Sequence, residues 1–309
     1  MSRRHAHPPL AGADMDRRLW ASAALNVAIT LAELFGGLLS GSLALLSDAA
    51  HNFSDVAAVA LALWARRLSR RPPTPHHTYG FKRAEVLAAL ANAVLLIGVS
   101  VVIAREALER LLHPTPVQQG LMLAVALVAL AANVGSVLLL RRHEKDDVNV
   151  RSAFLHMAQD ALASLAVVAA ALLAHTPVGL YVDPAAALIV VFAVLRSGLS
   201  LVWETLSTLL EGAPPDVSLD ALLDDVARAF PGATLHHLHF WQNGPGQRLL
   251  TAHVVVNEAL DGRAIECLFA EIKVFLHDRW GVAHATLEPE VTGCGETKIL
   301  ASWDDERSP

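Results

Sequence analysis

Two pairs of histidine and aspartate, each pair four residues apart, lie inside long apolar segments of this chain. The pairs are His51 with Asp55 and His156 with Asp160. Side chains four residues apart lie one above the other on a helix, so each segment presents an imidazole and a carboxylate in one direction. An Asp in the middle of a membrane span costs roughly 2.5 to 3.5 kcal/mol, so a functional role with a partner is the default reading. The pattern predicts two helix faces that turn toward each other.

The composition indicates that these helices lie in a membrane. Of the 309 residues, 54% are hydrophobic and only 17% are charged, which is too apolar for an ordinary soluble domain. Six apolar segments are each about long enough to cross ~30 Å of hydrocarbon. They cover residues 19–39, 43–64, 86–104, 121–140, 153–174 and 185–203. The sequence therefore predicts a membrane domain of six transmembrane helices over residues 17–206.

Positive charge predicts the orientation. Lys and Arg precede the first segment and follow the second and fourth, whereas the links after the first and fifth contain none. Because cytoplasmic loops carry the excess of Lys and Arg, we expect both termini in the cytoplasm and a multi-pass protein of the cell (inner) membrane. Residues 1–16 are polar and are predicted to form a mobile cytoplasmic tail.

The last third of the chain has a different composition. From Glu211 onward there are 7 Lys and Arg against 16 Asp and Glu, so this part is acidic and faces water. We expect a cytoplasmic domain over residues 211–295 and an acidic tail over 296–309. Nothing here is basic or aromatic enough to suggest nucleic-acid binding.

Periodicity predicts a small α+β fold for the cytoplasmic domain. A helical pattern at residues 216–230 is followed by two strands at 235–242 and 249–256. A second helical pattern at 264–280 and a strand at 283–287 complete an αββαβ order. Strict alternation would send His237 and His239 to one face of the first strand and His236 to the other.

Further histidines lie on the neighbouring strands. His253 is on the second strand, and His284 lies on the third near Glu288 and Glu290. The pattern is compatible with a surface zinc site and also with solvated strand histidines.

Other polar residues lie in the apolar segments. Asp48 lies on nearly the same helix face as His51 and Asp55. Two roles fit this position: a residue on the access path of the ion, or a hydrogen-bond acceptor behind the ligands. Glu33 in the first segment is expected either to line a water-filled access path or to pair with another polar group. A purely structural reading makes each His and Asp pair a polar contact between helices.

Two imidazoles and two carboxylates make a tetrahedral site that suits Zn²⁺, and the two carboxylate charges offset those of the ion. An imidazole must be unprotonated to bind metal, so protons and metal compete for it near neutral pH. This competition predicts exchange of zinc for protons if the site faces the two sides of the membrane in turn.

The chain resembles the cation diffusion facilitator family over nearly its whole length. The likeness is carried by the motifs LLSDAAHNFSD, HTYGFKRAEVLAALANA, ERLLHPTPV, AFLHMAQDALASLAVVAAALL and HHLHFW. It implies a homodimeric antiporter of divalent cations and protons, with six transmembrane helices and a ferredoxin-like cytoplasmic domain that binds metal, regulates and dimerises.

The pattern with histidine in both pairs is similar to that of the zinc-transporting branch of the family. Members of this branch can also carry cadmium or cobalt, and they typically export metal from the cytoplasm. Carried over by motif, the resemblance implies a transport site of His51, Asp55, His156 and Asp160. It also implies zinc in the cytoplasmic domain, at the matching positions His236, His253, His284 and Glu290.

The chain departs from the family in two loops. Where some members bind metal between spans two and three, this chain has Thr74, His77 and Phe81, and only one of these is a ligand. The loop between spans four and five contains His143 alone, in place of the long histidine-rich loop of many relatives.

Two other classes compete with a transporter. A membrane-embedded metalloenzyme needs an open coordination position and often an H-E-x-x-H motif, which this chain lacks. A metal sensor anchored in the membrane would have no need of ionisable groups inside its spans.

Overall fold

The computed structural model describes residues 10–141, 148–174, 176 and 178–291. The first part of the predicted N-terminal tail, His143, and the predicted acidic segment 296–309 lie outside these residues. The described residues form two compact units, one made of those up to Ala60 with those of Ala91–Ser200, and one made of Leu61–Leu90 with the residues from Leu201 onward.

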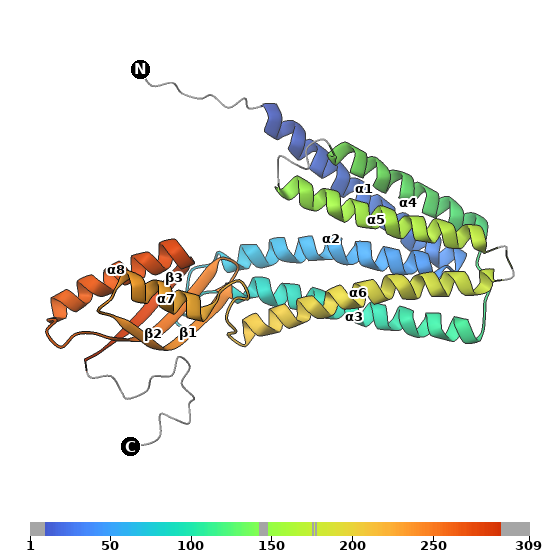
Figure 1. Ribbon diagram of the computed structural model, residues 1–309. Coiled ribbons are helices and arrows are strands. Elements are labelled where there is room, and N and C mark those ends of the chain that lie inside the picture. The colour runs from blue at the N-terminus through green and yellow to red at the C-terminus, as the bar shows by residue number, and fades with distance from the viewer. Residues whose placement is uncertain (1–9, 142–147, 175, 177, 292–309) are drawn as a thin grey trace. The chain divides into compact units, whose positions relative to one another are not determined.

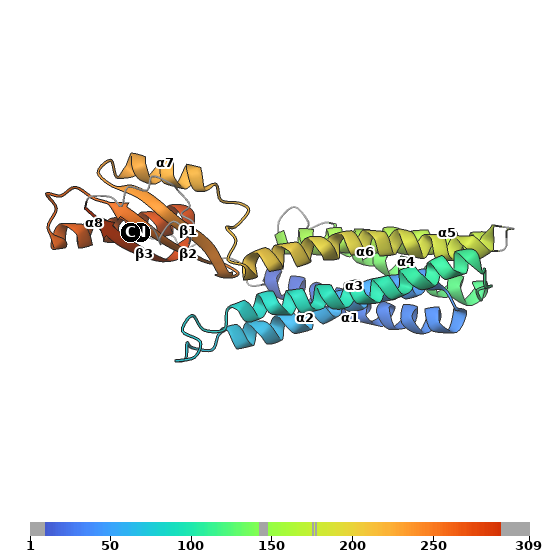
Figure 2. The ribbon, with the colours of Figure 1, turned by 90° about the horizontal axis from the view of Figure 1, so that it is seen from below.

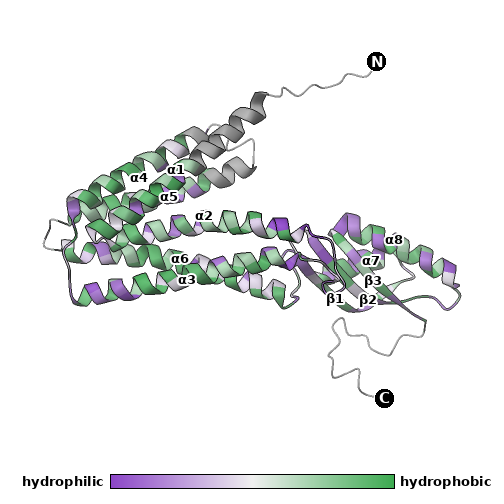
Figure 3. Ribbon diagram, turned by 180° about the vertical axis from the view of Figure 1, so that it is seen from behind, coloured by the Kyte–Doolittle hydropathy of each residue, from purple (hydrophilic) through white to green (hydrophobic). Residues whose placement is uncertain are grey.

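Six long helices contain the six predicted apolar segments. They are α1 (Leu10–Ser40), α2 (Leu43–Ser69), α3 (Arg83–Leu112), α4 (Gln119–Leu140), α5 (Val148–Leu173) and α6 (Gly179–Leu209). Helix α1 begins at Leu10, inside the segment predicted as a tail. Hydrophobic residues run along most of α3, α4 and α6 (Figure 3).

Four described helices are long and apolar enough to cross a membrane. They cover Arg83–Leu112, Gln119–Leu138, Phe154–Leu173 and Gly179–Leu209, and the shorter Ala24–Ser40 is also apolar. Helix α2 is missing from this set because it carries Asp48, His51, Asn52 and Asp55 among its apolar residues. The chain thus has a helical membrane part.

Helices α1, α4 and α5 pack along one another in the first unit (Figure 1). Gly36 permits the close approach of α1 and α4, because a Cβ atom there would lie 2.7 Å from Val125 Cγ2. Buried Ala126, Val167 and Ala171 form part of the small-residue core between the helices. This packing places α5, which carries one of the two ligand pairs, in a fixed position within the bundle.

The N-terminus of α2 is capped by a carboxylate from α6. Asp183 is buried and accepts hydrogen bonds from Ser42 Oγ at 2.5 Å, the Leu43 amide at 2.8 Å and the Ala44 amide at 3.3 Å. A carboxylate at this position satisfies free amides and complements the helix dipole. The helix that carries His51 and Asp55 is therefore anchored to α6 at its first turn.

We expect Asp183→Ala to destabilise the protein by about 2 to 3 kcal/mol, because buried donors of Ser42, Leu43 and Ala44 would lose their acceptor. Thermal unfolding of the purified protein in detergent measures the change as a lower Tm. Glu109→Ala removes an exposed carboxylate of α3 and should leave the Tm unchanged. Equal Tm values for the two variants would contradict the capping role.

The second unit contains the predicted αββαβ domain. Its elements are α7 (Leu219–Ala229), β1 (Thr234–Gly244), β2 (Gln247–Val255), α8 (Gly262–Trp280) and β3 (Val282–Glu290). The sheet has the order β1-β2-β3, with β1 and β2 antiparallel and β2 and β3 parallel. Figure 2 shows α7 beside the strands. The element order predicted from periodicity is confirmed.

One apolar core joins the two helices to one face of this sheet. Leu222 of α7, Ile272 and Leu276 of α8, and Leu238 and Leu250 of the strands are fully buried in it. The opposite face of the sheet is thereby left for polar side chains.

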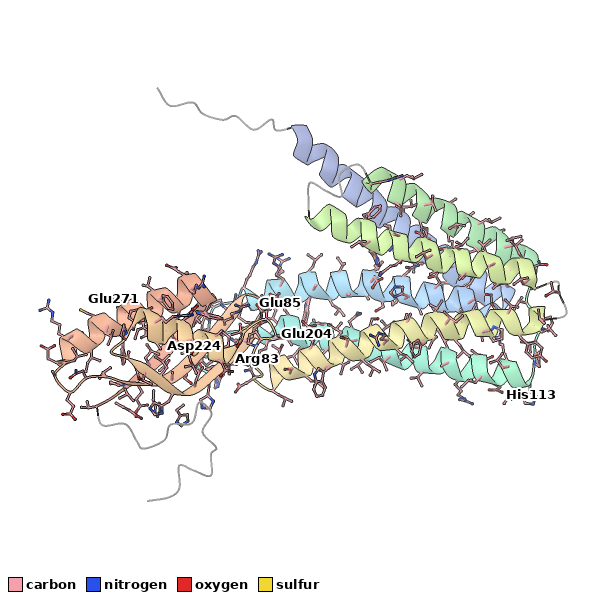
Figure 4. The ribbon with its side chains drawn as sticks, viewed as in Figure 1. Arg83, Glu85, His113, Glu204, Asp224 and Glu271 are labelled. Carbon is pink, nitrogen blue, oxygen red and sulfur yellow. The ribbon has the colours of Figure 1, made fainter. Side chains whose placement is uncertain are left out.

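Ion pairs at the surface add contacts within the second unit. Asp225 of α7 accepts hydrogen bonds from Arg228 and from Arg279 of α8, which lower the pKa of its carboxyl group. Arg83 at the start of α3, labelled in Figure 4, donates to Glu211 at 2.7 Å and to Asn243 at 3.1 Å.

Strand β1 differs from the predicted alternation at its histidines. The register shifts between His236 and His239, and His237 takes a left-handed backbone conformation with φ of 49°. This β-bulge inserts an extra residue, so Leu235, Leu238 and Phe240 all point into the core. The prediction that His236 faces away from His237 and His239 was wrong, because strict alternation does not hold across a bulge.

Candidate functional site

The structure brings the two His and Asp pairs together within the first unit. His156 Nε2 of α5 lies 3.5 Å from Asp55 Oδ2 of α2 and 3.7 Å from Asp160 Oδ2. His51 Nε2 lies 3.8 Å from the same Asp55 oxygen, and the two imidazole rings are 6.4 Å apart. Asp55 is the centre of the cluster because one of its oxygens faces both imidazoles.

These separations are close to those that a tetrahedral metal site requires. Ligand atoms about 2.0 to 2.1 Å from a zinc ion are about 3.3 to 3.4 Å from one another in a regular tetrahedron. The three nitrogen to oxygen distances of 3.5 to 3.8 Å exceed this by a few tenths of an ångström. The two imidazole rings are farther apart, with centroids separated by 6.4 Å, so the side chains would have to move inward together to hold one ion.

The site is accessible from one end and closed at the other. The side chains of Asp55 and His156 are each 34% exposed and that of His51 is 26% exposed, whereas Asp160 is only 1% exposed. Burial thus increases toward the N-terminus of α2 and the C-terminus of α5. One end of the cluster is partly exposed, and the other end is covered by protein.

A layer of buried polar residues seals the closed end. Asn52 Nδ2 of α2 donates to Glu33 Oε2 of α1 at 2.9 Å, and Asn133 Nδ2 of α4 donates to Ser164 Oγ of α5 at 3.2 Å. Asp48 is also buried in α2. This layer contains both residues expected on the access path, Asp48 and Glu33.

Sequence reasoning assigned no role to Asn52 or Ser164. A signal for both was present in the spacing, because Asn52 follows Asp48 by four residues and Ser164 follows Asp160 by four. Each therefore lies on the polar face of its own helix.

A second cluster lies in the C-terminal αββαβ domain. His236 Nε2 of β1 lies 2.9 Å from Glu290 Oε2 of β3, and His253 Nδ1 of β2 lies 2.6 Å from Glu290 Oε1. Their ligand atoms all lie within 4.8 Å of one another, a spacing at which one metal ion can be held. His253 Nε2 also lies 3.6 Å from Glu288 Oε2, and the His237 ring is 4.5 Å from the His253 ring.

Strand pairing explains why these residues meet. His236 is directly opposite His253 in the antiparallel pair, and the parallel pairing of β2 with β3 places Glu288 opposite His253. His284 pairs instead with Leu249. His284 lies six residues before Glu290 on β3, so about 20 Å separates these two residues at 3.3 Å per residue. The structure thus brings together His236, His253 and Glu290 and leaves His284 exposed elsewhere on the sheet.

Comparisons with known proteins indicate the family to which the chain belongs. Residues 19–210 match the family described as the cation efflux transmembrane domain. The chain is 39% identical over 280 residues to the zinc transporter ZitB of Escherichia coli K12, covering 90% of this chain and 88% of that protein.

Two further relatives have other metals in their names. The chain is 34% identical to the cadmium, cobalt and zinc/H(+)-K(+) antiporter of Bacillus velezensis, covering 100% of this chain and 98% of that protein. It is 36% identical to the metal cation efflux system protein CzcD of Cupriavidus metallidurans, covering 94% of this chain and 90% of that protein.

The apolar helices and the transporter relatives define a multi-pass membrane protein. The chain belongs to the cation efflux family, the cation diffusion facilitators that its motifs resemble, in the zinc branch.

Proposed function

We propose that this chain exports zinc across the cell membrane in exchange for protons. It is a transporter of divalent metal cations and not an enzyme. The observation that carries the proposal is the convergence of His51, Asp55, His156 and Asp160 from two helices of the membrane domain. The relatives named as zinc transporter and as metal/proton antiporter support the same function.

The ligand set supplies both binding and coupling. Two carboxylates offset the charge of Zn²⁺, which lowers the cost of holding the ion among apolar helices. Each imidazole binds either a proton or the metal through the same nitrogen lone pair. A proton that arrives at His51 or His156 would therefore weaken zinc binding and promote release.

The gradient of burial supports alternating access. The cluster opens toward the ends of α2 and α5 that carry Lys and Arg in the adjoining loops, which the positive-inside rule assigns to the cytoplasm. Zinc would enter from that side while Asp48, Asn52 and Glu33 close the other side. In this proposal all six helices α1 to α6 span the membrane, and both termini are cytoplasmic.

Cadmium and cobalt are the second candidate substrates. Two relatives are named for cadmium and cobalt transport or for general metal efflux. Imidazole and carboxylate ligands accept several divalent ions, so ligand type alone does not select zinc.

The cytoplasmic cluster is proposed as a regulatory zinc site. His236, His253 and Glu290 provide two imidazole nitrogens and a carboxylate within reach of one ion. In this proposal metal in the cytoplasm binds here and alters transport. The homodimer is proposed from the family resemblance, and chemical cross-linking in native membranes tests it.

Zinc uptake into everted vesicles tests the transport function. We expect His156→Ala to reduce uptake driven by a proton gradient by at least about 100-fold, since a metal ligand is lost. His113→Ala is the matched control, because His113 is exposed at the end of α3 (Figure 4). Uptake by His156→Ala at the wild-type rate, in vesicles with equal amounts of protein, would refute the proposed site.

A further inference from the structure

Four arginines stand close together at the end of α2, in the sequence RRLSRR of residues 66–71. Arg66 and Arg67 lie in the last turn of the helix, Arg70 and Arg71 follow it directly, and all four side chains are exposed. Hydrophilic residues are gathered at this end of α2 (Figure 3). The proposed exchange of zinc for protons uses none of these four side chains, which are called the arginine cluster below.

The arginine cluster has no acidic partner, although carboxylates are plentiful in the same compact unit. Other arginines of this unit do form ion pairs with its carboxylates, namely Arg83, Arg228, Arg248 and Arg279. Within the described residues, none of the four arginines of the cluster forms such a pair. Glu85 of α3 instead accepts a hydrogen bond from the buried Ser69 at 2.5 Å. Four positive charges therefore remain free at one place on the surface.

The length of α2 places the arginine cluster at the level of lipid headgroups. The helix has 27 residues, which span about 40 Å at 1.5 Å per residue, whereas the hydrocarbon of a bilayer is about 30 Å thick. A span that enters the hydrocarbon at Leu43 leaves it about 20 residues later, close to Leu63. Trp64 is 62% exposed at this point, and tryptophan is enriched where hydrocarbon meets headgroups. The arginines that follow lie just outside the hydrocarbon.

The arginines continue a face of α2 that is apolar one turn earlier. Arg66 and Arg67 follow the exposed Leu63 by three and four residues, so all three lie on one side of the helix. Ala65 and Ser69 are buried on the other side. A phospholipid has the same order of groups, with an acyl chain followed by a phosphate. A guanidinium group suits that phosphate, because it can donate two parallel hydrogen bonds to its oxygens.

We propose that the arginine cluster binds the headgroups of acidic phospholipids in the leaflet that it faces. Groups of four or more Lys and Arg directly beside a membrane span attract acidic lipids through their charge. A bound headgroup would hold the end of α2 at a fixed depth, and α2 carries the ligands His51 and Asp55. The inference takes from the proposed function only that α2 crosses the membrane.

Binding of fluorescent phosphatidylglycerol to the purified full chain in a neutral detergent tests this proposal. We expect Arg66→Gln with Arg67→Gln to weaken the binding by about 10-fold or more, because each basic residue near a membrane surface contributes a factor of about 5. High salt should weaken binding to the wild type, since the attraction is electrostatic. Fluorescent phosphatidylcholine should bind much more weakly than phosphatidylglycerol, because its choline group neutralises the phosphate.

Two matched variants separate charge at this place from total charge and from folding. Arg263→Gln with Lys273→Gln removes the same two charges from exposed positions of α8 and should keep the wild-type affinity. Arg66→Lys with Arg67→Lys retains the charge of the cluster and should bind phosphatidylglycerol within about 3-fold of the wild type. Thermal unfolding in the same detergent should give equal Tm values for all of these proteins.

Unchanged phosphatidylglycerol affinity of Arg66→Gln with Arg67→Gln would overturn the proposal, as would equal losses in this variant and in the α8 control. Displacement of the lipid by an equal concentration of inorganic phosphate would also overturn it, because the site would then bind free phosphate. The transport function is read separately. His156→Ala should bind phosphatidylglycerol like the wild type, and unaltered zinc uptake by His156→Ala would refute the transport site while the lipid result stands.

Discussion

Asp55→Asn is expected to abolish zinc transport, with a fall of at least about 100-fold in the rate of uptake into vesicles. Asp55 Oδ2 is the one oxygen that faces both His51 at 3.8 Å and His156 at 3.5 Å. Asparagine has nearly the same shape but carries no charge, so the ion would lose both a strong ligand and half of its charge compensation. The effect on transport should therefore exceed any effect on folding.

Asp55→Asn has a matched control in an exposed carboxylate of α3. Glu109→Gln removes the charge of an exposed carboxylate on α3 and should transport zinc at the wild-type rate. Thermal unfolding in detergent should give similar Tm values for Asp55→Asn and the wild type. Robust zinc uptake by Asp55→Asn would show that the ion does not pass through this cluster.

Glu290→Gln is expected to weaken zinc binding to the C-terminal αββαβ domain by about 10-fold to 100-fold. One Glu290 oxygen lies 2.9 Å from His236 and the other lies 2.6 Å from His253, so this carboxylate joins the two imidazoles. Loss of its charge removes the acidic ligand and leaves two histidines. Isothermal titration of the full chain with His51→Ala and His156→Ala isolates this site from the transport cluster.

Glu258→Gln is the matched control for Glu290→Gln, because Glu258 is exposed in the loop between β2 and α8. It should bind zinc as tightly as its parent protein. If Glu290→Gln also retained the parent affinity, the cluster of His236, His253 and Glu290 would not be a zinc site. Transport at saturating zinc by Glu290→Gln in an otherwise wild-type chain then measures whether the site regulates the carrier.

Much of the fold was predictable from local patterns. Apolar length predicted the six helices, and turn residues with two different periodicities predicted the order of α7, β1, β2, α8 and β3. These features depend on residues that are close in sequence, and therefore a single sequence contains the information. The ends of the helices were less predictable, as the start of α1 at Leu10 shows, because capping contacts often come from distant residues.

Contacts between distant residues could not be predicted in this way. Asp183 caps α2 from a position about 140 residues away, and Asn52 reaches Glu33 on another helix. The bulge at His237 turned His236 toward His253, which strict alternation did not anticipate. His284 had suitable chemistry but lies at the opposite end of β3 from Glu290, away from the cluster of His236 and His253.

The sequence by itself determined which side chains could hold a metal ion in the membrane, because a spacing of four residues puts His51 with Asp55 and His156 with Asp160 on single helix faces. Only the tertiary structure decided that Asp55 lies between both imidazoles and that an acidic layer of Glu33, Asp48 and Asp160 continues beyond them. The physical reason is that helix periodicity fixes directions within one helix, whereas the packing of α1, α2 and α5 fixes the distances between them.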